Sequence, residues 1–161
     1  MSIRNIQILS LNSHFIAKII QCFLTGYSKP CEIRIIFFVA PIIFYKSSRN
    51  KLIHANSKSK METIFEGKIS IENDIQVSSK VHLAGFWERY EQFKDYTKKS
   101  IIILSNEDKI IFDNFIELIE QLDYKSFDGE IKQWMRSAYY LGKIFSQATE
   151  IQINYYLGVE V

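Results

Sequence analysis

The chain is poor in glycine, proline and cysteine. Six glycines and two prolines in 161 residues argue against a turn-rich β-sandwich and favour long regular elements. Two cysteines, Cys22 and Cys31, are too few for a disulfide framework. They belong to no CxxC motif and have no nearby pair of histidines, so the sequence predicts ordinary thiols and no zinc site.

The sequence also lacks the motifs of common catalytic sites. It contains no GxxxxGK[ST] phosphate loop, no GxGxxG and no HExxH. The isolated histidines His14, His54 and His82 are interpreted as surface or core-edge residues rather than general bases. The acidic residues within 107–120 could be taken for a metal-dependent nuclease site. We instead expect them in a turn, as a helix cap and on a solvated helix face. We therefore predict no catalytic residue, metal, cofactor or small-molecule substrate, and no enzymatic activity.

Apolar residues are plentiful but form no run long enough for a membrane span. They make up 47% of the chain, and aromatic residues 14%, which is enough to fill a core. The apolar run at 35–44 has about half of the ~20 residues that cross a bilayer, and the N-terminal residues make no convincing secretory signal. We expect a cytoplasmic protein with one domain, 1–161, divided into a basic helical half (1–66) and a half with a long helix and a wing (78–161).

Charge is distributed unevenly along the chain. Residues 1–61 hold nine Lys and Arg against one acid, Glu32, whereas residues 62–161 hold eleven against seventeen. The sharpest step is a basic run without Asp or Glu, and its cations are the predicted partner- or nucleic-acid-binding residues: Lys46, Arg49, Lys51, Lys58 and Lys60. Such a run suits phosphate or an acidic protein. The alternative is a solvated face, with the asymmetry cancelling once the chain folds.

Apolar spacing predicts helices at 13–25, 31–44, 78–104 and 130–147, with shorter ones at 47–54, 57–65 and 115–122. Asn12 or Ser13 is expected to cap the first helix and Gly26 to end it, Ser47 or Ser48 to cap the helix at 47–54, and Asp113 to cap the one at 115–122. A buried strand remains an alternative at 31–44, although Pro41 cannot donate to a central ladder. A close helix contact would explain Gly142.

The remaining short segments complete a winged-helix-like arrangement. The segment 67–77 is predicted to be a loop or a short edge strand, and 109–112 a short strand after a turn at 106–108. Thr149 can cap a last short helix, with a strand at 151–155 as the alternative. The two helices at 47–65 are similar to a helix-turn-helix unit. The predicted fold is mainly α, a compact multi-helix domain with a winged-helix-like element and a short β wing.

Three places in the chain carry a family likeness. The first comprises Ala40, Pro41, Ile42, Lys46, Ser48, Arg49, Leu52 and Ser59; the second is the LGKIF stretch at 141–145; the third is Leu157, Gly158 and Val159. Together they resemble the middle component of bacterial three-component ABC systems, although Ala40 stands where leucine is usual. None of the three places is a catalytic signature, so the resemblance bears on fold and role more than on sites.

The resemblance implies a non-catalytic adaptor that joins an SMC-like ABC ATPase to an effector, often a nuclease, as in Lamassu-type anti-phage defence. It leaves open whether DNA is contacted, directly or through the complex. The aromatic pairs Phe86–Trp87, Tyr139–Tyr140 and Tyr155–Tyr156 exceed what single helix faces bury, which also favours a protein partner. A free-standing winged-helix-like DNA-binding protein that uses the basic run is the alternative.

Overall fold

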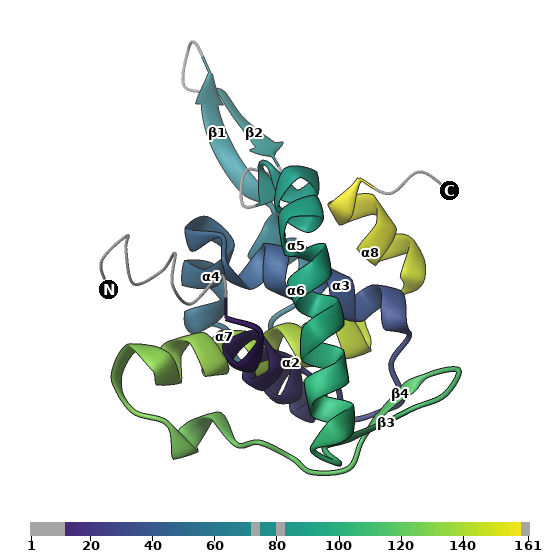
Figure 1. Ribbon diagram of the computed structural model, residues 1–161. Helices are drawn as coiled ribbons and strands as arrows, with labels where there is room; N and C mark the ends of the chain where they lie inside the picture. The colour runs from purple at the N-terminus through teal and green to yellow at the C-terminus, as the bar shows by residue number, and fades with distance from the viewer. Residues whose placement is uncertain (1–11, 72–74, 80–82, 159–161) are drawn as a thin grey trace.

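The computed structural model describes residues 12–71, 75–79 and 83–158, and the described chain is mainly helical (Figure 1). The α-helices are α2 (Ser13–Tyr27), α3 (Ile33–Ile43), α4 (Lys46–Ile53), α5 (Met61–Phe65), α6 (Phe86–Asn106), α7 (Gly129–Gln147) and α8 (Glu150–Leu157). Two antiparallel hairpins join β1 (Gly67–Ile71) to β2 (Ile75–Ser79) and β3 (Ile110–Phe112) to β4 (Ile116–Leu118). The predicted class, a mainly α domain with a β wing, is confirmed.

The centre of the fold is the contact between α2 and α7, which is the most extensive contact between two helices. Two glycines make it possible. A Cβ added at Gly142 would lie 2.1 Å from the carbonyl oxygen of Phe23, and one at Gly26 would lie 2.0 Å from that of Tyr139. The close contact expected at Gly142 is confirmed. Gly26 does not end α2, because the helix continues to Tyr27 and Ser28 takes the left-handed conformation after it. Gly26 instead allows α7 to approach, since any side chain at this position would clash with the backbone of Tyr139.

Helix α3 crosses the interior and packs on α2, α6, α4 and α7. Eight of its eleven residues are buried, which fits a segment that is apolar nearly all round. The helical alternative for this segment is confirmed, with Pro41 inside the helix. The end of α3 therefore leaves carbonyl groups in the interior that need hydrogen-bond donors from elsewhere.

Two predicted helices differ from the structure. The long helix begins at Phe86 rather than at 78, because 75–79 pair with 67–71 as β2 and β1; residues 80–82 lie outside the described residues. The prediction of a helix at 115–122 is wrong, because this segment contains β4. Ile116 pairs with Phe112 across the β3–β4 hairpin, and its N–H and carbonyl oxygen exchange hydrogen bonds of 2.8 and 2.9 Å with Cys31. Non-local pairing has replaced the local helical pattern, so Asp113 caps no helix.

Several local predictions hold. The Asn12 side chain accepts hydrogen bonds from the first backbone N–H groups of α2. Thr149 and Gln152 form a capping box at the start of α8, which settles the segment 151–155 as helix. Asp108 takes a left-handed conformation, φ 57°, in the turn between α6 and β3. Within the described ranges, no helix combines the length and the apolar character that spanning a membrane requires.

Candidate partner-binding surfaces

The corner between α3 and α4 holds the residues at the centre of the basic run. Three side chains supply donors to the last carbonyl groups of α3: Arg89 Nε to Pro41 at 2.8 Å, Ser48 Oγ to Ile42 at 2.5 Å, and Arg49 Nη1 to Ile43 at 3.0 Å. Helix ends that are buried need such partners, and a cation there is also favoured by the helix dipole. Ser48 therefore closes the preceding helix rather than capping its own, and α4 follows Tyr45 without a side-chain cap.

Arg49 is a structural residue. Only 7% of it is exposed, and its guanidinium carbon lies 4.0 Å from the centre of the Trp134 ring. Burial lowers the pKa of Arg49, and the nearby charge of Glu130 partly opposes the shift. An arginine keeps its charge in proteins, so the cation is held inside by the Ile43 carbonyl and the indole face. This placement withdraws Arg49 from the predicted binding set.

The other four predicted residues, Lys46, Lys51, Lys58 and Lys60, are exposed. They lie on α4 and on the link 54–60 between α4 and α5. The side-chain ion pairs of the described chain join Arg34 to Glu32 and Glu150, and Lys109 to Glu120. None of these pairs involves the four lysines, so their charge is available to an anionic partner. We call these four residues the lysine face.

The link that carries Lys58 and Lys60 is attached firmly to the core. Arg136 of α7 donates to the carbonyl groups of Ile53 at 2.9 Å and Ala55 at 2.8 Å. Within the link, the Asn56 side chain accepts from the N–H of Lys58 at 2.8 Å, and Ser59 Oγ accepts from the N–H of Asn56 at 3.0 Å. Ser59, part of the family likeness, thus shapes the link. Phosphate contacts from such a rigid support would position a nucleic acid without reading its sequence.

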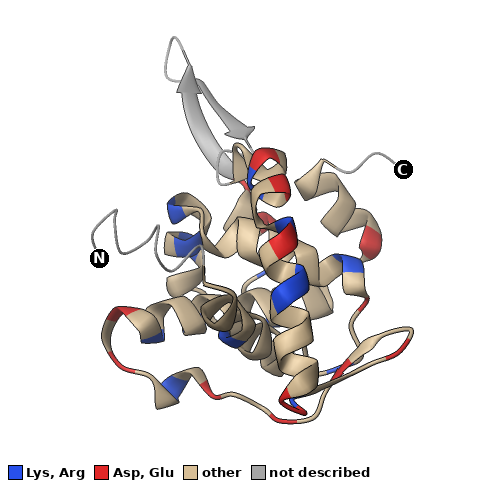
Figure 2. Ribbon diagram, viewed as in Figure 1, with Lys and Arg blue, Asp and Glu red and all other residues tan. Residues whose placement is uncertain are grey.

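The charge asymmetry of the sequence persists in the folded chain. Figure 2 shows lysine on α4 and a string of acidic residues along the segment from the end of α6 to the start of α7, in the lower part of the view. The segment 107–130 holds eight Asp and Glu against Lys109 and Lys125, and all eight acids are exposed. The two regions would attract partners of opposite charge.

The predicted aromatic pairs are mostly part of the core. Phe86 and Tyr156 are buried, and Tyr139 and Tyr140 are half-buried beside Tyr124. The Tyr156 hydroxyl donates to Glu66 at 2.7 Å, and burial, followed by this contact, raises the pKa of Tyr156. Trp87 and Tyr155 are 40% and 60% exposed. The protein partner inferred from these pairs stays a prediction.

The structure exposes two apolar surfaces. Sequence reasoning missed the first of them and the Ile151 part of the second, whereas Trp87 and Tyr155 belong to the predicted aromatic pairs. The first, which we call the hairpin surface, consists of Ile111, Phe112, Phe115 and Ile119, each between 48% and 54% exposed. The second, the α8 surface, consists of Ile151 at 80%, Tyr155 and the neighbouring Trp87. Helix α8 also buries Ile153, Tyr156 and Leu157, so apolar side chains project from more than one side of this helix. The signal for α8 was present in the sequence, because five of its eight residues are apolar or aromatic, which is more than one buried stripe of a short helix needs.

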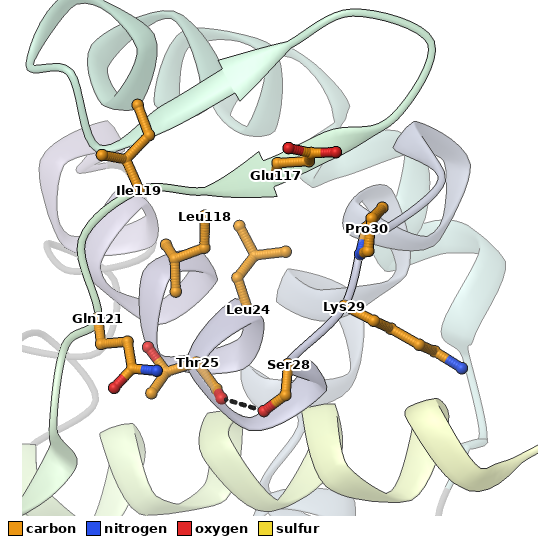
Figure 3. Close-up of a pocket in the computed structure, with 9 residues that line it drawn as sticks. All are labelled: Leu24, Thr25, Ser28, Lys29, Pro30, Glu117, Leu118, Ile119 and Gln121. Atoms are coloured by element: carbon orange, nitrogen blue, oxygen red, sulfur yellow. Dashed lines mark hydrogen bonds between the residues drawn. The ribbon is translucent and has the colours of Figure 1, made fainter.

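A groove lies beside the hairpin surface, between the end of α2, the segment after it and β4 (Figure 3). Its volume is about 500 Å³. Leu24 of α2 and Leu118 of β4 point toward each other within it, whereas Glu117 and Ile119 lie on the other side of the strand (Figure 3). The two hydroxyl groups in its lining, of Thr25 and Ser28, donate to backbone carbonyl groups rather than to a base. The described residues contain no group of three His, Cys, Asp or Glu suited to a metal ion.

The class that these features define is a mainly helical domain with a β wing whose described surface offers charged and apolar groups to a partner. The family model for the ABC-three component (ABC-3C) system Middle Component 3 matches residues 2–161. The chain therefore belongs to this family of middle components, which agrees with the general resemblance found in the sequence. Searches of curated proteins and of solved structures found no match.

Proposed function

We propose that this middle component is a non-catalytic adaptor in a bacterial anti-phage defence complex of the Lamassu type. It would join an SMC-like ABC ATPase to an effector, often a nuclease, in the cytoplasm. The observation that carries the proposal is the match of 2–161 to a middle-component family. Two exposed apolar surfaces support it, because apolar surface of this kind is typical of sites that a protein partner covers.

An adaptor of this kind transmits a signal only if its affinity for a partner differs between two states of the system. Two apolar surfaces on different elements suit that task, since one can hold the ATPase while the other holds the effector. The hairpin surface combines isoleucine and phenylalanine with nearby acids, whereas the α8 surface contains a tryptophan and a tyrosine, two of the residue types most common as anchors of protein interfaces. The two surfaces thus have different chemistry, as two different partners require.

Co-purification tests the proposal. The tagged chain is co-expressed with the proteins encoded beside it and washed at roughly 0.5 M salt, which removes most phosphate-driven contact and leaves an apolar interface largely intact. Recovery of an ATPase at a fixed ratio, identified by mass spectrometry, is the expected outcome. A chain that emerges alone from this wash in every combination of neighbours contradicts the adaptor role.

The lysine face favours a second candidate, a winged-helix-like DNA-binding protein. The order α4, α5, β1, β2 is that of a winged helix with its wing after the second helix. Against this candidate, α5 has five residues, little more than one helical turn and short for a helix that enters the major groove.

Duplex binding by the isolated chain separates the two candidates. A DNA-binding protein binds duplex alone, and Lys51→Glu with Lys58→Glu weakens binding and reduces the steepness of its salt dependence. Lys98→Glu, an exposed lysine on α6, is the matched control. Fluorescence anisotropy at about 0.15 M salt that detects no binding by the unaltered chain excludes this candidate.

A further inference from the structure

The β3–β4 hairpin stands at the edge of the fold with one side attached and one side open. Cys31 pairs with Ile116 along the outer side of β4, and Ile110, Ile116 and Leu118 turn toward the interior as buried or half-buried residues. Figure 1 shows the hairpin beginning at the lower end of α6 and extending away from it toward the right of the view. The attachment makes the hairpin a rigid part of the fold rather than a loose loop.

The open face of the hairpin is apolar where a solvated face would be polar. Ile111 is directly opposite Glu117 in the ladder, and Glu117 and Ile119 lie on the same side of β4 (Figure 3). Outward faces of antiparallel sheets normally carry polar residues. Here Ile111 is 54% exposed and Ile119 is 53% exposed, with Phe112 and Phe115 at the tip of the hairpin. Two exposed isoleucines on this face and two exposed phenylalanines at the tip indicate a surface that another molecule covers.

Acidic residues surround these apolar side chains. We call Glu107, Asp108, Asp113, Glu117 and Glu120 the acidic border; all are exposed. The one base within 107–120, Lys109, is paired with Glu120. The border therefore has a net negative charge that selects for positive charge in whatever covers the hairpin surface.

Two kinds of occupant fit poorly. Nucleic acid is repelled by the acidic border. A second copy that used its own hairpin would place like charges opposite each other, because a two-fold interface brings the same patch from both subunits. A second copy that used its lysine face would present Lys46, Asn50 and Lys51 of α4, which are polar and leave the apolar side chains uncovered.

We propose that the hairpin surface binds a cationic, amphipathic segment of a partner protein. The segment would place apolar side chains against Ile111, Phe112, Phe115 and Ile119, and Lys or Arg against the acidic border. This inference rests on the proposed adaptor function and specifies one of its two docking sites. The apolar centre supplies most of the affinity, while the border sets orientation and accelerates association.

Zero-length crosslinking of the co-purified complex identifies the occupant. A carbodiimide joins carboxylates directly to lysines in contact with them. Trypsin cleaves after Lys109 and Lys125, so the peptide 110–125 carries Asp113 and Glu117 together with Glu120 and Asp123, and fragmentation of the peptide identifies the linked carboxylate. Glu120 is already paired with Lys109, so an internal link between these two residues is expected as a separate product. The expected product links this peptide to a lysine-containing segment of a different protein. Mass spectrometry identifies the two linked peptides and therefore the partner.

Paired substitutions measure the contribution of the surface. Ile111→Ser with Phe115→Ser is expected to weaken binding of the crosslinked partner at least about tenfold, as truncation of two central apolar anchors does. The matched control, Ile151→Ser with Tyr155→Ser, removes two exposed apolar side chains from α8 and is expected to leave the 110–125 crosslink intact. Asp113→Asn with Glu117→Gln is expected to weaken binding at low salt and to have little effect at roughly 0.5 M.

The outcomes separate this inference from the proposed function. A complex that forms with the same affinity after the Ile111 and Phe115 substitutions overturns the hairpin site and leaves the adaptor role in place. A 110–125 crosslink to a second copy of the chain, detected by mixing isotope-labelled and unlabelled protein, overturns the proposed occupant. Recovery of the chain without any partner contradicts the adaptor role, and the inference falls with it.

Discussion

Arg49 on α4 is buried although it is charged, and Ile111 on β3 is exposed although it is apolar. The arginine is 7% exposed and the isoleucine is 54% exposed. The buried cation has two favourable contacts, with the Ile43 carbonyl and the Trp134 ring. The exposed isoleucine has no comparable compensation in the described chain, since a charged residue, Glu117, is its cross-strand neighbour. The comparison teaches that a cation in a basic run can be structural and that an apolar strand residue can belong to an interface.

Substitution of two isoleucines of the hairpin region, Ile116 and Ile119, should give the largest difference in the free energy of unfolding. Ile116→Ala should lower the free energy of unfolding by about 3–4 kcal/mol, because a fully buried side chain leaves a cavity. Ile119→Ala, three residues further and 53% exposed, should change it by about 0.5 kcal/mol or less. Urea unfolding of the two variants measures both values. Equal losses would mean that Ile119 is part of the folded core and not of the hairpin surface.

Arg49 and Lys51 give the second comparison, on one helix. Arg49→Met should lower the free energy of unfolding by about 2–3 kcal/mol, since the Ile43 carbonyl loses its donor and the Trp134 ring loses its cation. Lys51→Met should stay within about 0.5 kcal/mol. The midpoint of urea unfolding at unchanged m-value is the measurement. A stable Arg49→Met protein would return Arg49 to the set of candidate binding residues.

Ser48 should contribute less than Arg49. Ser48→Ala should lower the free energy of unfolding by about 1–2 kcal/mol, because the buried carbonyl of Ile42 then lacks the hydroxyl that donates to it. Ser57→Ala, at an exposed position of the link 54–60, is the control and should be nearly neutral. Thermal melts followed by circular dichroism compare the two variants. A neutral Ser48→Ala would show that the helix end finds another donor.

Alkylation of Cys22 and Cys31 measures how firmly the β3–β4 hairpin is attached to the segment before α3, where Cys31 pairs with Ile116. Near neutral pH both thiols are protonated, so they can be used as reporters without changing the free energy of unfolding. Burial raises the pKa of Cys31, beside Glu32, and of Cys22, near Asp123, each from 9.0 to about 12. The folded thiols should therefore resist alkylation at pH 8, and urea should expose them. Ile116→Ala should accelerate the reaction of Cys31 before that of Cys22, because Cys31 pairs with Ile116. Equal acceleration of both thiols would contradict a loss of structure that begins at the pairing of Cys31 with Ile116.

The same raised pKa values predict the direction of a pH effect. The unfolded thiols begin to ionise near pH 9, whereas the folded thiols keep their protons to about pH 12. Their contribution to stability is complete below pH 9 and is lost as the pH rises from 9 to 12. Urea unfolding of Cys22→Ala and Cys31→Ala variants at pH 8 and pH 10 measures it. A stability of the unaltered chain that rises over this interval would contradict the assignment.

Much of the helical framework was predictable from short stretches. Asn12 and Thr149 cap the helices expected of them, and Gly142 lies at a close helix contact. The two caps act between residues that are adjacent or one turn apart, so neighbours in the sequence are sufficient to produce them. The contact at Gly142 joins α7 to α2, and the sequence signals it only through a glycine inside a helix. The same holds for α3, whose almost uninterrupted apolar character predicts an interior position.

The hairpin and the binding residues were less predictable. The apolar spacing of 115–122 suits a helix as well as a strand, and the choice was made by pairing with Phe112 and with Cys31, which is distant in the sequence. The basic run suggested five equivalent cations. Their separation into Arg49 inside and four lysines outside depends on where α7 places Trp134, which no spacing in the run encodes.

The amino-acid sequence by itself determined the helical class, the caps at Asn12 and Thr149, the interior position of α3 and the kinship with middle components, because these follow from local preference, periodicity and motif. Tertiary structure alone decided which charges are available and which apolar side chains remain exposed. Burial depends on elements that meet from distant parts of the chain. For Arg49 these elements are the end of α3 and the side of α7, and for the hairpin surface they are β4 and the segment that begins α3.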